Sequence, residues 1–313
     1  MVGGPKRLAV TVGDPRGIGP EILPAALRAY FADGSDAEIV VLGDVRSLSG
    51  LPAECRCRPV GRFAGDLQSA GTVSLRAIEE AVSLARRGEV DALVTGPVHK
   101  PALQAAGVGH PGQTELLQEL TAARRVGMLM HAGPSRGTGP LRVLLATTHH
   151  PLRRVASLVT AELLVDQVAL LASHLVRGWQ IEQPRIAVCG LNPHASDGGL
   201  FGNEEETVFV PAIESLRHSG IDATGPHPAD TVFLRMVRGE ADAVVVPYHD
   251  VGMAVFKTLA FGRGVNTTLG LPFPRTSPDH GTAFDRVGTG SADPTSFTEA
   301  VRLAARLAAH AGP

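Results

Sequence analysis

The strongest constraint on the fold is an alternation of short apolar runs with longer amphipathic stretches. Six apolar runs, each ending in a turn or a polar cluster, cover 7–14, 37–44, 91–98, 141–148, 184–192 and 241–250. Such runs are typical of buried strands. Amphipathic stretches of helical period lie at 72–87, 155–175, 204–218 and 296–310. Strand followed by helix, repeated along the chain, predicts an α/β protein with a largely parallel sheet.

The composition indicates a globular protein and gives no sign of a nucleic-acid or membrane partner. With 313 residues, 44% of them apolar, the chain can bury the core of one large domain or of two modest ones. The net charge of −2, without blocks of like charge, gives no electrostatic reason to expect a nucleic acid or an anionic membrane as partner. We expect a cytoplasmic protein, because the sequence shows neither a secretory leader nor an apolar run of about 18 residues. The three cysteines are interpreted as free structural thiols.

Histidines follow three of the predicted strands. His149, His194 and His249 each come shortly after an apolar run, at strand ends where open α/β sheets bind ligands. Three neutral imidazoles around one point would hold a metal such as Zn²⁺ and leave a coordination position open for substrate. The alternative is three unrelated loop histidines, and placement at strand ends does not decide between the two interpretations.

Two further segments point to anionic ligands. The stretch 257–275 combines glycines with Lys257, Arg263, Asn266 and Arg275, which suits an anion, although a glycine-rich loop with solvated charges is the plainer interpretation. The polar stretch 279–293 leads into a helix whose N-cap is predicted near residues 293–295, where a pyrophosphate or adenosine can bind. A Rossmann dinucleotide site is not predicted, because the spacing of Gly17 and Gly19 breaks the glycine fingerprint.

Seven motifs together carry a family resemblance. They are GDPRGIGPE at 13–21, TGPVHK at 95–100, ATTH at 146–149, GLNPHA at 190–195, PADT at 228–231, YHD at 248–250 and RTSPDHGTAFD at 275–285. In this order they resemble the 4-hydroxythreonine-4-phosphate dehydrogenase family of vitamin B6 biosynthesis. The first and last motifs are also distantly similar to segments of isopropylmalate and isocitrate dehydrogenases, which bind NAD(P) on a non-Rossmann α/β fold.

The resemblance implies a fold and an assembly. It implies an isocitrate/isopropylmalate dehydrogenase-like α/β fold with a mostly parallel sheet and two subdomains around an active-site cleft. A discontinuous cofactor-side subdomain is expected at 1–125 with 270–313, and a central subdomain for metal binding and dimerisation at 126–269. The active site would lie at a homodimer interface.

The resemblance also implies the site residues. It places a divalent metal (Zn, Mg, Mn or Co) on His149, His194 and His249, one of them supplied by the second subunit. It implies that the substrate contacts Gln113, Thr114, Lys257, Asn266 and Arg275. The expected catalytic residues are Lys257, Asp230 and Asp250, with Lys257 and Asp230 as alternative bases. NAD, with NADP as an alternative, would lie against Gly270, Asp279, His280, Gly281, Thr282 and Asp285.

The implied reaction is the metal- and NAD-dependent oxidation of 4-phosphohydroxy-L-threonine, with decarboxylation to 3-amino-2-oxopropyl phosphate. The chain carries Gln113 and Val251 where the family usually has His and Gln. Three alternatives therefore stay open. Two are oxidations, of 4-phospho-D-threonate or 4-phospho-D-erythronate and of an aromatic cis-dihydrodiol, and the third is the reaction of a metal-dependent hydrolase or lyase on a sugar phosphate. A catalytically idle ligand-binding relative is a further possibility. Formation of NADH separates the oxidations from hydrolysis, lysis and ligand binding without turnover.

Overall fold

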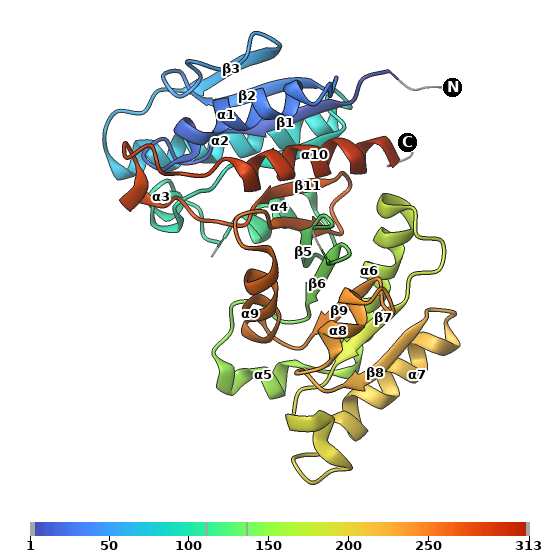
Figure 1. The fold of residues 1–313 in the computed structure, drawn as a ribbon. Helices are drawn as coiled ribbons and strands as arrows, with labels where there is room; N and C mark the ends of the chain where they lie inside the picture. The colour runs from blue at the N-terminus through green and yellow to red at the C-terminus, as the bar shows by residue number, and fades with distance from the viewer. Residues whose placement is uncertain (1–3, 111, 136, 311–313) are drawn as a thin grey trace. The chain divides into compact units, whose positions relative to one another are not determined.

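The computed structural model describes residues 4–110, 112–135 and 137–310, and the chain divides into two compact units. Unit 1 comprises Met1–Val126 and Val265–Pro313, and unit 2 comprises Gly127–Gly264. The chain therefore leaves unit 1 after residue 126 and returns to it at residue 265 (Figure 1).

The sheet of unit 1 is parallel except for its last strand. Its order is β3 (Cys55–Gly61), β2 (Glu38–Asp44), β1 (Arg7–Thr11), β4 (Ala92–Thr95), β11 (Arg275–Pro278) and β10 (Val265–Leu269). All neighbours from β3 to β11 are parallel, whereas β10 and β11 are antiparallel. In β1, Leu8, Ala9 and Val10 are fully buried, as expected for a central strand covered on both faces.

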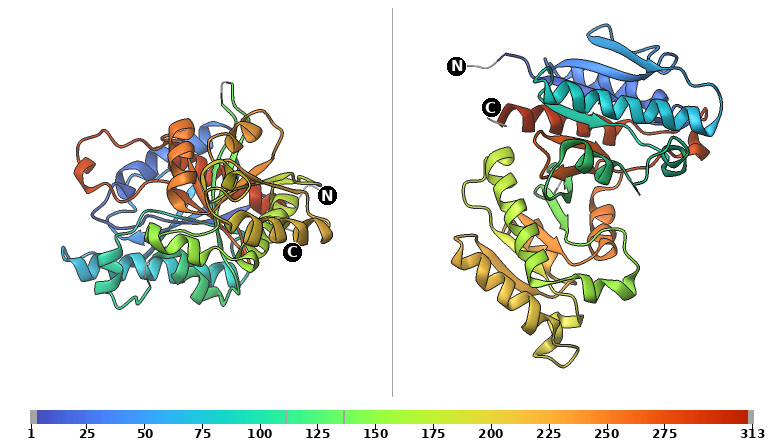
Figure 2. Two further views of the ribbon diagram at one scale, coloured as in Figure 1. Left: turned by 90° about the horizontal axis from the view of Figure 1, so that it is seen from below. Right: turned by 180° about the vertical axis from the view of Figure 1, so that it is seen from behind.

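Helices cover both faces of this sheet (Figure 2). Helix α2 (Leu67–Arg86) packs on one face through a cluster that includes Ala77, Ile78 and Ala81, while α1 (Gly19–Ala32) and α10 (Thr295–His310) pack together on the other. The two short helices α3 (Lys100–Ala105) and α4 (Gln113–Thr121) pack against α2.

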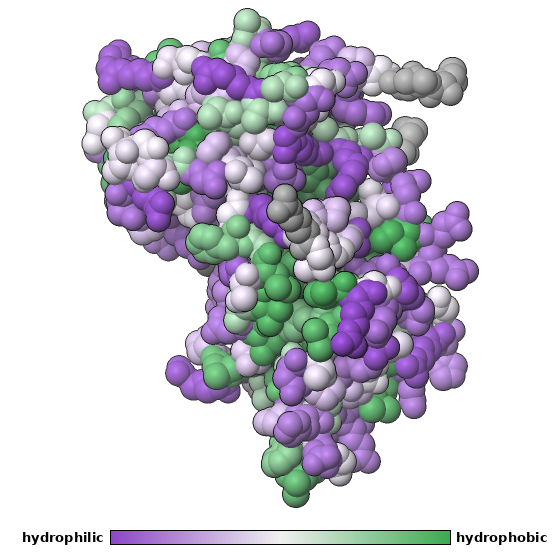
Figure 3. Space-filling model, viewed as in Figure 1, coloured by the Kyte–Doolittle hydropathy of each residue, from purple (hydrophilic) through white to green (hydrophobic). Residues whose placement is uncertain are grey.

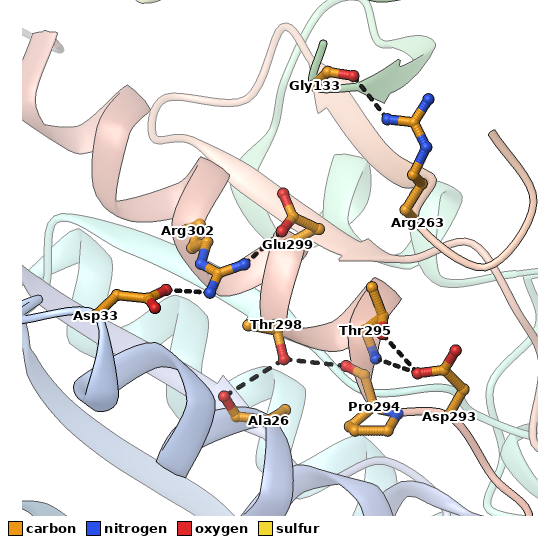
Figure 4. A network of polar contacts seen from close by, with 10 residues as sticks. All are labelled: Ala26, Asp33, Gly133, Arg263, Asp293, Pro294, Thr295, Thr298, Glu299 and Arg302. Carbon is orange, nitrogen blue, oxygen red and sulfur yellow. Dashed lines mark hydrogen bonds and ion pairs between the residues drawn. The ribbon is translucent and has the colours of Figure 1, made fainter. Parts of the chain in front are cut away.

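Polar contacts fix the start of α10 and join it to α1 (Figure 4). Asp293 Oδ1 accepts hydrogen bonds from the Thr295 backbone N at 2.8 Å and the Thr295 Oγ1 at 2.6 Å, which confirms the predicted start of this helix. Further along α10, Thr298 Oγ1 donates to the Ala26 carbonyl at 3.4 Å, and Arg302 pairs with Asp33.

In unit 2 four neighbouring strands are parallel. The order is β5 (Gly127–Ala132), β6 (Leu141–Leu145), β9 (Ala243–Val246), β7 (Ile186–Cys189) and β8 (Ala223–His227). Only the β5–β6 pair is antiparallel. Since β6, β9 and β7 run in the same direction, their carboxyl ends lie along the same edge of the sheet.

The helices of unit 2 are α5 (Leu152–Leu158), α6 (Ala161–Trp179), α7 (Val210–His218), α8 (Val232–Val237) and α9 (His249–Ala260). The predicted single helix over 155–175 is wrong, because α5 and α6 are separate. Val159 is extended, and the Thr160 side chain accepts a hydrogen bond from Leu163 N at 3.1 Å, which starts a new helix. The stretch 204–218 consists of a π-helical turn, η2 (Glu205–Phe209), followed by α7.

The interpretation of 257–275 as a glycine-rich loop is also wrong. Lys257 lies in α9, and the remainder contains β10 and the first residue of β11; these two strands pair with Asn266 opposite Ser277 and Thr268 opposite Arg275. Each of the six predicted strand runs does contain a strand, but β3, β5, β8, β10 and β11 were not predicted.

Within the described residues, no single helix is long and apolar enough to cross a membrane. Helices α5 and α6 meet that requirement only when taken together, across a bend of 88°.

Candidate functional site

In unit 2 the histidines follow the carboxyl ends of adjacent strands. Thr147 Oγ1 donates to the Pro247 carbonyl at 2.7 Å, which ties the segment after β6 to the segment after β9. The rings of His149 and His249 lie 5.3 Å apart between centroids and are tilted by 44°. Two of the three predicted metal ligands are thereby brought together by the pairing of β6 with β9.

His249 is oriented by a neighbouring carboxylate. It is the first residue of α9, and its Nδ1 donates to Asp250 Oδ1 at 2.8 Å. A carboxylate only accepts hydrogen bonds, so this contact puts the ring proton on Nδ1 and leaves Nε2 as the ligand atom. Such a carboxylate–histidine pair is the usual support for a metal-bound imidazole.

His194 follows β7 in the short helical turn η1 (Pro193–Asp197). It is exposed and lies in the left-handed region with φ 56°, and its ring centroid is 6.2 Å from that of Phe201. Among the residues that the structure describes, no group of three potential metal ligands forms within the chain. Sharing of the metal by all three histidines stays a prediction.

The predicted catalytic residues of unit 2 lie on α9 and before α8 (Val232–Val237). Asp250 and Lys257 are seven residues apart on α9 and share one side of that helix, since a turn takes 3.6 residues. The Lys257 Nζ lies 5.9 Å from the centroid of the Phe261 ring. Asp230 is exposed, and it contributes to raising the pKa of the Cys189 thiol, which burial brings to about 12.

In unit 1 the most unusual group is Arg275. It is 2% exposed, and among the described residues its guanidinium donates only to neutral oxygens: Thr95 Oγ1 at 3.1 and 2.5 Å, Thr268 Oγ1 at 2.9 Å and Gln113 Oε1 at 3.4 Å. Burial lowers its pKa to about 10, so the guanidinium stays charged at neutral pH. A buried cation that contacts only neutral acceptors is suited to binding an anion.

Gln113 contacts this arginine, and Asn266 lies on the same face of the sheet. Asn266 shares one face of β10 with Thr268, and Asn266 Oδ1 is buried without a hydrogen-bond partner among the described residues. Gln113 opens α4 and donates through Nε2 to the Gly96 carbonyl at 3.2 Å. The half-buried Thr114 is the next residue of α4. Four of the five predicted substrate residues therefore lie in unit 1, and the fifth, Lys257, lies in unit 2.

The predicted cofactor segment packs against the N-terminal motif. Ile18 N donates to the Thr282 carbonyl at 3.0 Å, and Gly288 N donates to Glu21 Oε1 at 2.7 Å. A Cβ on Gly17 would lie 2.9 Å from the Thr282 carbonyl oxygen, so a glycine is required for this approach.

The individual cofactor residues differ in their surroundings. Asp279 Oδ1 accepts from Ser296 Oγ at 3.3 Å, His280 Nε2 is buried without a partner among the described residues, and Gly281 and Asp285 are exposed. Gly270 has φ +89°, and a Cβ there would lie 2.1 Å from the Arg125 carbonyl oxygen. Packing against Arg125 already accounts for this glycine.

A cluster beside this segment was not predicted as a site. Arg16 pairs with Asp14 at 2.7 Å, its guanidinium lies 3.2 Å from His99 Nδ1, and its Cζ lies 5.3 Å from the centroid of the Phe284 ring. Asp14, Arg16 and His99 all belong to the first two motifs of the sequence. Their place in those motifs was the only available signal, because the three residues meet through tertiary packing.

Comparison with known proteins identifies the family. The family described as "Pyridoxal phosphate biosynthetic protein PdxA" matches residues 36–304. The chain belongs to this family. A 4-hydroxythreonine-4-phosphate dehydrogenase of Chromobacterium violaceum is 44% identical, over 98% of this chain and 99% of that protein. The crystal structure of the enzyme of that name from Klebsiella pneumoniae is 37% identical, with a TM-score of 0.84 over 98% of this chain and 99% of that one.

These similarities confirm the predicted family, fold class and enzyme class, which is that of an oxidoreductase. An isocitrate dehydrogenase from Methylococcus capsulatus is similar in fold alone. It is 15% identical, with a TM-score of 0.57 over 97% of this chain and 87% of that one.

Proposed function

We propose that this member of the PdxA family oxidises 4-phosphohydroxy-L-threonine with NAD and a divalent metal, and that decarboxylation gives 3-amino-2-oxopropyl phosphate. The proposal rests on the names of its relatives, and the observation that carries it is the buried Arg275 with its neutral acceptors. A phosphate supplies the negative charge that this guanidinium lacks. A dihydrodiol without an acidic group would leave the charge without a counterion, whereas the dihydrodiol of an aromatic dicarboxylate would offer a carboxylate in place of the phosphate.

The substrate phosphate is proposed to contact Arg275, with Gln113 and Thr114 beside it. Gln113 replaces the usual family histidine with a neutral amide, so Arg275 supplies the greater part of the charge. Asn266 is proposed to contact a polar group of the substrate, because its buried Oδ1 needs a hydrogen-bond donor, which a hydroxyl or an ammonium group supplies.

The imidazoles of unit 2 fit a divalent metal. His149 and His249 lie ring to ring, and Asp250 holds His249 in the tautomer that a metal requires. When bound, the metal would act as a Lewis acid on the alcohol and would stabilise the negative charge that develops beside it. His194 is proposed as the third ligand, with one of the three histidines coming from the second subunit.

Asp250, Asp230 and Lys257 are proposed to handle the proton of the substrate alcohol. Asp250 accepts from His249 and therefore orients that ring. Asp230 and Lys257 are the two candidate bases, and only a base whose pKa lies near the working pH is efficient. A shift in the acidic limb of the pH–rate profile on replacing one of them identifies the base.

NAD, with NADP as the alternative, is proposed to lie against Asp279, His280, Gly281, Thr282 and Asp285, with Gly270 at the edge of that surface. When bound there, the nicotinamide would supply the hydride acceptor for oxidation of the alcohol. The contacts of this segment with Ile18 and Glu21 hold it against the N-terminal motif, so its backbone is ordered before the cofactor binds.

A homodimer is proposed, with unit 2 as its interface. Unit 2 exposes several large apolar side chains, and hydrophobic residues gather on one of its faces (Figure 3). Phe261 is 82% exposed and lies just beyond α9, which carries His249. A cytoplasmic location is proposed from the sequence alone.

The test is formation of NADH by the purified protein with added divalent metal, followed by absorbance at about 340 nm. The substrates are 4-phosphohydroxy-L-threonine, 4-phospho-D-threonate, 4-phospho-D-erythronate and an aromatic cis-dihydrodiol, each with and without a chelator. The proposal expects chelator-sensitive NADH formation with the first compound and loss of that activity in Arg275→Met. Faster NADH formation with another compound of the panel would show that the proposed substrate is wrong and that the other compound is the substrate. Absence of NADH with all four would overturn it.

A further inference from the structure

The turn that carries His194 has an unusual backbone. Four consecutive residues other than glycine, from 194 to 197, have φ between 46° and 75°. Elsewhere in the described residues such positions occur singly. The left-handed conformation costs roughly 1–2 kcal/mol for each residue with a Cβ, so the surrounding structure must hold this turn.

A buried carboxylate holds the chain immediately before the turn. Glu205, in the π-helical turn η2, is 3% exposed. Its Oε1 accepts from Leu191 N at 2.8 Å and Asn192 N at 2.7 Å, and its Oε2 accepts from Asn192 Nδ2 at 2.8 Å. All three donors belong to the two residues that precede Pro193 and His194.

The turn is closed on its other side as well. Ala195 N donates to the Asn192 carbonyl at 3.1 Å, and Ser196 Oγ donates to the Gly202 carbonyl at 2.6 Å. A Cβ built on Gly190 would lie 3.1 Å from Glu205 Oε1 and 3.2 Å from the Ala195 Cα. The end of β7, the carboxylate and the left-handed turn are therefore packed directly against one another.

Burial of the Glu205 carboxylate is unfavourable for the stability of the folded protein. Its contacts are all with neutral N–H groups, and no cation pairs with it among the described residues. Burying a carboxylate without a counterion costs free energy that neutral hydrogen bonds only partly return. The neighbouring Glu206 is exposed, so the burial is specific to one glutamate of a run of three.

We propose that Glu205 is a positioning residue for metal binding: it fixes residues 191–192, and through them the left-handed turn, so that the imidazole of His194 is presented for coordination. The inference rests on the proposed function, since it takes His194 as a ligand. Glu205 acts only through the backbone of the turn and does not contact the metal.

The conservative variant Glu205→Gln tests this role. It keeps the size of the side chain but replaces one acceptor oxygen with an NH₂ group. That group faces either the backbone N–H donors of residues 191 and 192 or the Asn192 amide. The exposed neighbour gives the matched control, Glu206→Gln, and His194→Ala reports direct loss of the proposed ligand.

The measurement is titration of the chelator-treated full-length protein with Co²⁺, followed through the visible d–d absorption, which depends on the ligand geometry. We expect Co²⁺ affinity to fall about 10–100-fold in Glu205→Gln, with an altered spectrum, as for other residues that orient metal ligands. Glu206→Gln should match the wild type in affinity and spectrum. Circular dichroism and thermal unfolding establish that each variant is folded.

The outcomes separate the inference from the proposed function. Absence of Co²⁺ binding by the wild type would remove the proposed metal site, and unchanged binding by His194→Ala would exclude His194 as a ligand; either result would overturn the inference as well. Binding that is lost in His194→Ala but unchanged in Glu205→Gln would overturn the inference alone. If Glu205→Gln does not fold, Ser196→Ala decides, because it opens the same turn from its other end. Unchanged affinity and spectrum in that folded variant would overturn the inference.

Discussion

Replacement of Arg275 by methionine tests whether unit 1 holds its buried charge for a ligand. Burial lowers the pKa of this guanidinium to about 10, and each pKa unit corresponds to about 1.4 kcal/mol, so keeping the charged form inside costs on the order of 3 kcal/mol. The cost is present in full below pH 10, where the arginine is ionised in both states, and declines only as the pH rises above that value.

Arg275→Met removes this cost together with the hydrogen bonds to Thr95, Thr268 and Gln113. Each such bond contributes on the order of 1 kcal/mol, and the two threonine hydroxyls lose only an accepted bond. Without ligand, we expect the free energy of unfolding to stay unchanged or to rise by up to about 3 kcal/mol. This corresponds to a Tm increase of up to several degrees, at roughly 2–4 °C per kcal/mol.

Added inorganic phosphate is expected to stabilise the wild type and not Arg275→Met. A ligand at a hundred times its Kd stabilises the folded protein by about 2.7 kcal/mol, so inorganic phosphate should raise the Tm of the wild type and leave that of Arg275→Met unchanged. Arg56→Met is the control, because Arg56 lies on the surface beside Glu38 and its loss should alter neither the Tm nor the response to phosphate. The reasoning fails if Arg275→Met loses more than about 2 kcal/mol of stability without ligand, or if phosphate still stabilises it.

Three further predictions concern the metal, the fold and the thiols. His149→Ala should abolish Co²⁺ binding and chelator-sensitive turnover without lowering the Tm, since His149 is exposed, and retained binding would exclude it as a ligand. Gly270→Ala should cost more than about 2 kcal/mol in urea unfolding, because its Cβ would lie 2.1 Å from the Arg125 carbonyl oxygen at φ +89°. Gly34→Ala, at φ +77° with open space around the Cβ, should cost about 1 kcal/mol, and equal losses in the two variants would contradict the packing argument. A disulfide reagent at pH 8 should label only Cys57 rapidly, because burial raises the pKa of Cys55 and of Cys189 to about 12, and rapid labelling of Cys189 would show that its strand opens.

The parallel strands and the placement of the histidines could be predicted from local patterns. Buried parallel strands are continuous apolar runs, so local patterns place His149 and His249 at strand ends; that the two rings meet depends on the long-range pairing of β6 with β9. The break between α5 and α6 was missed because the cap at Thr160 lies within an unbroken amphipathic pattern.

The buried charges could not be predicted in the same way. Arg275 looked like a solvated charge among glycines and prolines, and its burial depends on strands that pair only in the folded sheet. Glu205 lies in a run of three glutamates that is typical of an exposed helix start. Its burial is explained only by the hydrogen bonds that its carboxylate accepts from the turn after β7. Long-range packing of this kind leaves no periodic signal in the sequence.

The discontinuity of unit 1 affects the order in which the protein matures on the ribosome. Every strand and helix of unit 2 has been synthesised once residue 264 has emerged, whereas β4 still lacks its neighbour β11 and α1 still lacks α10. Until the second segment of unit 1 arrives, from residue 265 onward, the apolar side chains of the central strands remain open on one face. Nascent chains in this interval expose a sheet edge and an apolar surface together, the combination that chaperones bind. Unit 1 therefore cannot be completed until residues 265–310 have emerged, whereas unit 2 has all of its strands and helices before that point.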